Sequence, residues 1–175
     1  DLAVHDLSIM DHVVGRSPVA VAATGMAHVP GEPANMAYLT CWFDDDLLAH
    51  FHVNWLAPVK VRQMMICGTE KMIVYDDTSN EPVRVFDSGV SLPNPETFGE
   101  YKLSYRTGDI ISPRVEAAEP LYLEMQDFCT SIREGSTPTS SAEIGLEVVR
   151  MVEAVDASLE ENGARVEVAP VASTH

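Results

Sequence analysis

The chain has 175 residues, of which 46% are hydrophobic and 22% charged; its 11 Lys and Arg residues against 27 Asp and Glu residues give a net charge of −16. This composition is typical of a folded globular domain. The negative charge argues against nucleic acids and anionic membranes as partners, because both bind basic surfaces. An anionic substrate would therefore need a local basic pocket.

Cysteine usage and hydropathy indicate the cellular setting. Cys41, Cys67 and Cys129 are widely spaced and form neither a CxxC pair nor a disulfide framework, which is typical of the reducing cytoplasm. No stretch approaches the roughly eighteen consecutive apolar residues of a membrane-spanning helix. Because the chain begins with Asp rather than Met, we expect a fragment of a longer protein. We expect residues 1–175 to form one domain, with residues 170–175 as a loose tail.

The first fourteen residues predict a short helix that ends at the Gly and Pro residues of positions 15–18. Asp1 and His5 are four residues apart, so on a helix their side chains are neighbours. Asp1 could then accept a hydrogen bond from one ring nitrogen of His5 and leave the other nitrogen free to exchange a proton with a substrate hydroxyl. The alternative is that Asp1 only caps the helix and His5 is a surface or core residue.

A series of short β-strands follows, separated by turn-forming residues. The predicted strands cover residues 19–29, 36–43, 47–56, 59–67, 72–75, 83–86 and 101–106. Strands 36–43 and 47–56 would form a hairpin across the acidic turn at residues 44–46. Residues 87–100 contain two glycines and two prolines, which predicts an excursion or mobile loop.

Two long helices close the chain. Pro120 suits a first helical position, apolar residues recur with helical period up to Ile132, and Gly135 ends this helix. Residues 140–143, Ser-Ser-Ala-Glu, predict a capping box for the second helix, which Gly163 ends. Residues 166–168 could return as an edge strand. The pattern predicts an α+β fold, with a largely antiparallel sheet that carries the long helices on one face and leaves the other face open.

The predicted hairpin has two unlike faces. One face is apolar and would take the long helices; the other carries Tyr38, Thr40, Trp42, His50, His52 and Asn54, which suits a subunit interface or a ligand surface. The alternative is a solvated sheet face with scattered aromatic residues. His50 and His52 share one side of a strand, but zinc needs three or four converging ligands, so we expect structural histidines and no metal site.

The few basic residues are candidate substrate ligands. Lys60 and Arg62 would alternate on one side of a strand, and Arg106 lies in a loop-like stretch. An ammonium and a guanidinium near a proton-transferring histidine suit a substrate that carries a carboxylate or phosphate. The alternative is ordinary cross-strand ion pairing on an acidic protein. The sequence has no Gly-x-Ser-x-Gly nucleophile motif, no phosphate-binding loop and no dinucleotide fingerprint.

Several short motifs, in this order, resemble the C-terminal domain of the glucose–fructose oxidoreductase/inositol dehydrogenase (Gfo/Idh/MocA) family of NAD(P)-dependent oxidoreductases. They span essentially the whole chain: Asp-x-x-x-His at residues 1–5, Asn-Trp-Leu-Ala-Pro at 54–58, Gly-Thr-Glu at 68–70, Val-Tyr-Asp-Asp at 74–77, Glu-Pro-Leu at 119–121 and Gly-Leu-Glu-Val-Val at 145–149. The resemblance implies a dihydrodipicolinate-reductase-like C-terminal domain without its N-terminal Rossmann domain.

The resemblance also implies an activity and roles for two residues. His5 would be the general base that takes a proton from a sugar, polyol or nucleotide-sugar hydroxyl while hydride leaves for the nicotinamide, and Asp1 would bind substrate or orient His5. NAD or NADP would be bound by the full-length protein, and no cofactor is expected for this chain alone. The open sheet face would form a homo-oligomer. The competing hypothesis is a non-catalytic binding or oligomerisation module that keeps the fold.

Overall fold

The computed structural model describes residues 2–91, 104–116 and 118–169. These residues form two compact units, which we call the first unit (Asp1–Pro58 with Glu124–His175) and the second unit (Val59–Leu123). The expectation of one domain over residues 1–175 stays a prediction. The predicted tail, residues 170–175, lies outside the described residues.

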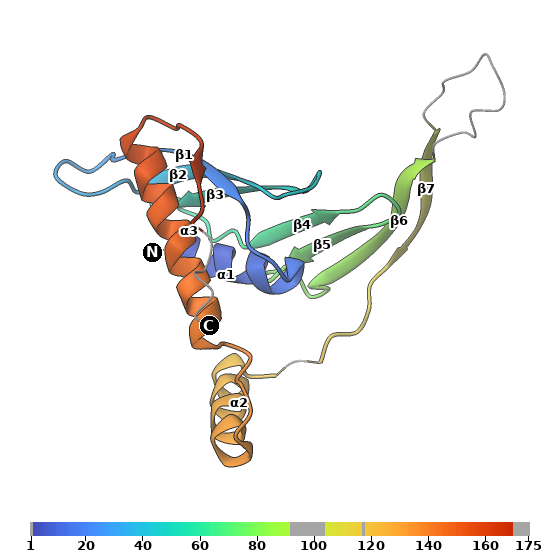
Figure 1. The fold of residues 1–175 in the computed structure, drawn as a ribbon. Coiled ribbons are helices and arrows are strands. Elements are labelled where there is room, and N and C mark those ends of the chain that lie inside the picture. Colours follow the sequence, from blue (N-terminus) through green and yellow to red (C-terminus); the bar gives the residue numbers. More distant parts are fainter. Residues whose placement is uncertain (1, 92–103, 117, 170–175) are drawn as a thin grey trace. The chain divides into compact units, whose positions relative to one another are not determined.

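The first unit is built on a four-stranded antiparallel sheet with the strand order β3-β2-β1-β8 (Figure 1). The β2–β3 register pairs Leu39 with Phe51 and Tyr38 with His52, which confirms the predicted hairpin and its two faces. The strand bounds are β1 (Ala20–Met26), β2 (Met36–Trp42), β3 (Leu48–Asn54) and β8 (Val166–Glu167).

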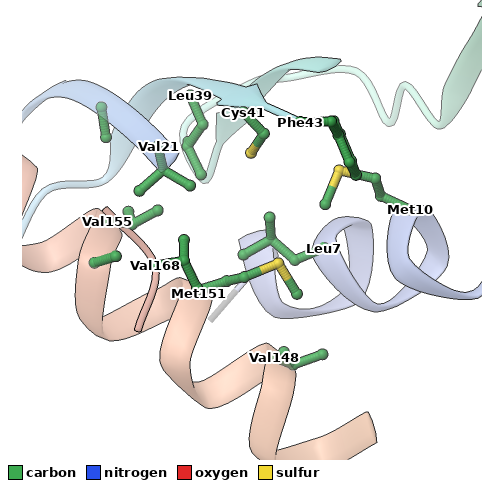
Figure 2. Close-up of a cluster of buried hydrophobic side chains, with 12 residues drawn as sticks. Leu7, Met10, Val21, Leu39, Cys41, Phe43, Val148, Met151, Val155 and Val168 are labelled. Atoms are coloured by element: carbon green, nitrogen blue, oxygen red, sulfur yellow. The ribbon is translucent and has the colours of Figure 1, made fainter. Parts of the chain in front are cut away.

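Two helices, α1 (Leu2–Val14) and α3 (Ala142–Glu160), cover one face of this sheet (Figure 1). Leu7 of α1 and Met151 of α3 are fully buried and point toward the sheet, where Leu39 and Cys41 meet them (Figure 2). Burying such side chains contributes about 1.5–3 kcal/mol each. The same face of β1 and β2 therefore supplies the core, and the opposite face stays open.

The ends of α3 follow from local chemistry. Ser141 is the N-cap and its hydroxyl accepts a hydrogen bond from the Ile144 N–H. The predicted capping box is therefore wrong, because the cap lies one residue later and places Ile144, not Glu143, at the third position. Gly163 has a φ of +90°, a left-handed conformation that suits glycine after a helix, as predicted.

The remaining helix, α2 (Pro120–Glu134), has the predicted bounds but not the predicted packing. Within the described structure Ser131 is its one buried residue, and the apolar stripe of Leu121, Met125, Phe128 and Ile132 is exposed. The expectation that both long helices cover the sheet is wrong for α2, because α1 and α3 already fill that face.

The second unit is a four-stranded antiparallel sheet with the order β4-β5-β6-β7. The start of the predicted loop at residues 87–100 is wrong: residues 87–91 belong to β6, and residues 88–91 pair with β7, whereas residues 92–100 lie outside the described residues. Gly89 makes this possible, because a Cβ there would lie 2.5 Å from the Thr69 carbonyl oxygen. The bounds are β4 (Gln63–Cys67), β5 (Met72–Asp76), β6 (Val83–Ser91) and β7 (Ser104–Ile111).

Candidate active site

Helix α1 presents His5 to solvent while its other side is anchored in the core. Leu7 and Met10 are buried, and Ala3 and Val14 pack against the same cluster, so one stripe of the helix faces the sheet. His5 lies outside this stripe and is exposed. An exposed imidazole on a helix fixed by its apolar face is well placed to exchange a proton with a bound molecule.

The predicted partner of His5, Asp1, lies outside the described residues. The hydrogen bond between them, and the tautomer of His5 that it would select, stay predictions.

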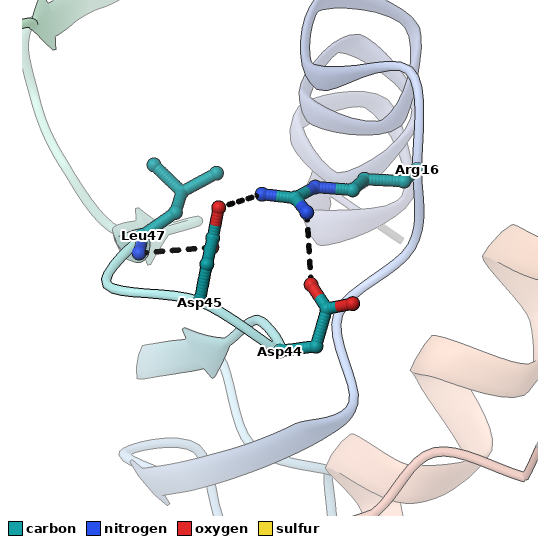
Figure 3. Close-up of polar contacts among 4 residues, drawn as sticks. All are labelled: Arg16, Asp44, Asp45 and Leu47. Atoms are coloured by element: carbon teal, nitrogen blue, oxygen red, sulfur yellow. Dashed lines mark hydrogen bonds and ion pairs between the residues drawn. The ribbon is translucent and has the colours of Figure 1, made fainter.

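The C-terminal end of α1 is tied to the β2–β3 hairpin by one arginine. The Arg16 guanidinium forms ion pairs with Asp44, at 2.8 Å, and with Asp45 (Figure 3). The hydrogen bond from Arg16, followed by one from the Leu47 N–H, holds the pKa of Asp45 below its ordinary value, and Asp45 in turn raises the pKa of Arg16. Sequence reasoning missed this residue, although an arginine directly after a helix and a run of three aspartates are its visible signals.

The three predicted basic ligands lie in the second unit, whereas His5 lies in the first. Lys60 and Arg62 precede β4, so the expectation that they alternate along a strand is wrong. Both approach the same Asp77 carboxylate oxygen, at 3.6 and 3.3 Å. Asp77 is therefore the shared ion-pair partner of both cations.

Arg106, on β7, has a separate environment. Its guanidinium pairs with Asp87 at 2.9 Å and donates a hydrogen bond to the Glu70 carbonyl oxygen. The structure thus brings Lys60 and Arg62 together and places Arg106 with other partners. These contacts match the ion pairing that the sequence offered as the alternative to substrate binding.

The open side of the first sheet, which we call the neutral face, carries no Asp, Glu, Lys or Arg on its three long strands. On it, the His52 ring stacks on the Tyr38 ring with centroids 4.5 Å apart, and the Arg165 guanidinium lies 5.0 Å from the Trp42 ring centroid. The face consists of Ala20, Ala22, Thr24 and Met26 of β1, Met36, Tyr38, Thr40 and Trp42 of β2, and Leu48, His50, His52 and Asn54 of β3.

A shallow pocket of about 440 Å³ lies where β1 begins beside β8. Its polar lining includes Ser17, Glu147 and Arg165. The Ser17 hydroxyl lies 2.7 Å from an Asp11 carboxylate oxygen and 3.2 Å from one of Glu147. Sequence reasoning missed this cluster, because it joins residues far apart in the chain. None of the residues that line the pocket belongs to the described part of α1, so the pocket is separate from His5.

The part of the chain that the structure describes contains no group of three or more His, Cys, Asp or Glu side chains placed to hold a metal ion. Its paired strands are all antiparallel. No described strand runs through a Gly-rich turn into a helix, which is how a dinucleotide phosphate is usually cradled. The described residues therefore do not fit a nicotinamide cofactor on their own. None of the described helices has the length and apolar character needed to cross a membrane.

The chain resembles known proteins in sequence over residues 1–74 and in fold over most of its length. Residues 1–74, which include α1 and His5, match the family model of the GFO/IDH/MocA C-terminal domain. A comparison with curated protein sequences gives no match. Many solved structures share the fold of the chain.

Three of these structures illustrate the likeness, each with the share of this chain that is covered. Levoglucosan dehydrogenase in complex with NADH matches with a TM-score of 0.75 and 18% identity over 98% of the chain. UDP-N-acetylglucosamine 3-dehydrogenase GnnA from Acidithiobacillus ferrooxidans gives 0.72 and 18% over 93%. A putative NADPH-dependent oxidoreductase from Desulfitobacterium hafniense DCB-2 gives 0.70 and 20% over 96%.

In each case the chain spans about half the length of the solved structure, namely 50%, 47% and 47%. At these identities the likeness shows the shared fold. The fold and the sequence match over α1 through β5 agree with each other and with the motifs in the sequence. Residues 1–74 therefore resemble the GFO/IDH/MocA C-terminal domain in sequence, and the chain shares the fold of these three solved structures.

Proposed function

We propose that this chain is the substrate-binding and catalytic domain of an NAD(P)-dependent dehydrogenase that acts on a sugar, polyol or nucleotide-sugar. Two of the structures that share its fold are dehydrogenases, of levoglucosan and of UDP-N-acetylglucosamine, and one of them is a complex with NADH. The observation that carries the proposal is the exposed His5 on the core-anchored helix α1, within the segment that matches the family model.

In this proposal His5 takes the proton of the substrate hydroxyl as the C–O bond becomes a carbonyl, and gives it back in the reverse reaction. Asp1 orients the ring or binds the substrate. The hydride acceptor, a nicotinamide, is held by a part of the full-length protein other than the described residues. Lys60, Arg62 and Arg106 are candidate ligands for an anionic group of the substrate, and Lys60 and Arg62 lie together at Asp77.

The test is the substitution His5→Asn in the full-length protein. We expect kcat to fall by about 10²–10⁴-fold, the usual contribution of a general base, while substrate affinity changes little. His12→Asn is the matched control, because His12 is also exposed on α1 but lies two turns away. Turnover of the His5 variant within a few-fold of the wild type, with the true sugar, would show that His5 is not the base.

We also propose that the chain associates with copies of itself through the neutral face. A second function class, a binding or oligomerisation module without catalysis, is favoured by the same observation: a broad uncharged surface on a chain of net charge −16. Two such chains repel each other over most of their surfaces, so an uncharged face is where they can meet.

Leu48→Glu tests this association, because Leu48 is 57% exposed on the neutral face. We expect sedimentation of the chain to shift from an oligomer to a monomer, since docking would bury the new carboxylate on each copy. Leu47→Glu is the matched control: Leu47 is the preceding residue, is also exposed, and lies in the turn before β3. Equal association of both variants and the wild type would place the interface elsewhere.

A further inference from the structure

We propose that the neutral face docks on a second copy of this chain only while His50 and His52 are uncharged, so that self-association is lost on mild acidification. This inference rests on the proposed self-association and adds its regulation. It concerns the twelve side chains of the neutral face, of which His50, His52 and Tyr38 are the ones that can titrate.

The charges around the neutral face favour a second copy of the same chain as its binding partner. The neutral face offers hydroxyl, imidazole and amide groups that can both donate and accept hydrogen bonds, so it can pair with itself across a twofold axis. At its β8 edge lie one cation and one anion: Arg165 over the Trp42 ring, and Glu167 opposite Ala20 in register. One charge of each sign at the same edge is also compatible with pairing to an identical edge.

In the described part of the chain, neither His50 nor His52 forms an ion pair. His52 stacks on Tyr38, and the Nδ1 atom of His50 lies 3.4 Å from the Thr40 hydroxyl. From β2, the neighbouring strand, the facing side chains are Tyr38, Thr40 and Trp42, and Tyr38 alone among them titrates.

The other element that packs against β3 is α1, and it meets the opposite side of the strand through the apolar core. The ionisable side chains of the described part of α1 therefore do not face the two imidazoles; they are His5, Asp6, Asp11 and His12. The other charged groups near this face are the Arg165 guanidinium over Trp42, Glu167 of β8, which β1 and β2 separate from β3, and the acidic residues 44–46 between β2 and β3.

Docking would remove water from both rings on each copy, and desolvation favours the neutral form of an imidazole. Association is then linked to deprotonation, so we expect it to weaken as the solution becomes mildly acidic. The overall charge predicts the opposite trend, because protonation of six histidines makes the chain less negative and reduces the repulsion between copies. The direction of the pH effect thus separates the two mechanisms.

The experiment is sedimentation velocity of the 175-residue chain at about pH 7.5 and about pH 5.5, one unit on each side of the ordinary histidine pKa. A salt concentration of about 0.15 M limits long-range repulsion, and circular dichroism at both pH values verifies the fold. We expect the dissociation constant of the oligomer to rise by at least about tenfold at the lower pH.

The double variant His50→Gln/His52→Gln should associate equally at both pH values, because glutamine keeps hydrogen-bonding capacity without a titrating charge. His12→Gln, on α1, should retain the pH dependence of the wild type. Association that is unchanged or stronger at low pH would overturn the inference and leave self-association standing, as would a pH effect that survives in the double variant. A monomeric wild type at the higher pH would overturn both proposals.

Discussion

At the scale of single residues, the buried hydroxyl of Ser158 shows how the edge of the first sheet is completed. Strand β8 is two residues long and pairs with Ala20 and Val21, so the Ala23 N–H of β1 has no strand partner on that side. The Ser158 hydroxyl of α3 takes that place: it accepts from the Ala23 N–H at 2.8 Å and donates to the Ala164 carbonyl at 2.6 Å. One side chain thus satisfies two backbone groups.

We therefore expect Ser158→Ala to destabilise the chain by about 1–3 kcal/mol, because it would leave buried polar groups without partners. Ser158 is fully buried, so water cannot easily replace the hydroxyl. Denaturant unfolding measures the effect. Ser8→Ala is the control, because the Ser8 hydroxyl, in the middle of α1, makes no hydrogen bond in the described part of the chain. Equal stability of both variants and the wild type would show that this bridge contributes little.

The same residue scale explains which site residues the sequence could predict. Helical spacing and the resemblance both pointed to His5; its exposed position on α1 agrees with the spacing, and its catalytic role stays a prediction. Ser158 and the Arg16 clamp were not recognisable, because each depends on contacts between segments far apart in the chain. Lys60 and Arg62 were singled out because basic residues are scarce, and their role as substrate ligands stays a prediction; Asp77, which pairs with both, gave no local signal.

At the scale of elements, local pattern predicted those parts of the fold that local physics determines. The helices α1, α2 and α3 appear with nearly the predicted bounds, because apolar period and glycine stops fix them. The β2–β3 register also follows from alternation, since a shift by one residue would move Leu39 and Cys41 out of the core.

Elements that depend on distant partners were predicted less well. Strand β6 extends to Ser91 because β7 pairs with it, although its sequence around Gly89 is poor in strand-forming residues. The apolar stripe of α2 predicted a buried helix, yet periodicity cannot say which surface a helix meets. Both errors concern tertiary partners rather than local propensity.

At the scale of the whole molecule, the sequence predicted one antiparallel sheet, and the structure has two four-stranded antiparallel sheets in two compact units. Residues 59–62, which were expected to be in a strand, instead precede β4. The fold was nevertheless recognisable, and residues 1–74 match the family model that the motifs suggested, because several weak motifs in a fixed order are more specific than any one of them.

The proposed function places the nicotinamide outside the described residues, which leads to a final prediction. A dinucleotide site usually needs a parallel βαβ unit with a Gly-rich turn at a helix N-terminus, and the described strands pair only in antiparallel fashion. The net charge of −16 further disfavours a pyrophosphate on most of the surface. We therefore expect no saturable change in NADH fluorescence when the 175-residue chain is titrated with the cofactor.

The full-length protein is the positive control in this titration and should bind NADH or NADPH saturably. The His5→Asn variant of the full-length protein should bind it equally well, because His5 acts on the substrate proton in the proposed mechanism rather than on the cofactor. Tight, saturable binding by the 175-residue chain would reveal a cofactor site within it, and the substrate-domain assignment would then fail. Loss of cofactor binding in the His5 variant would instead make His5 a cofactor ligand and remove the argument for it as the base.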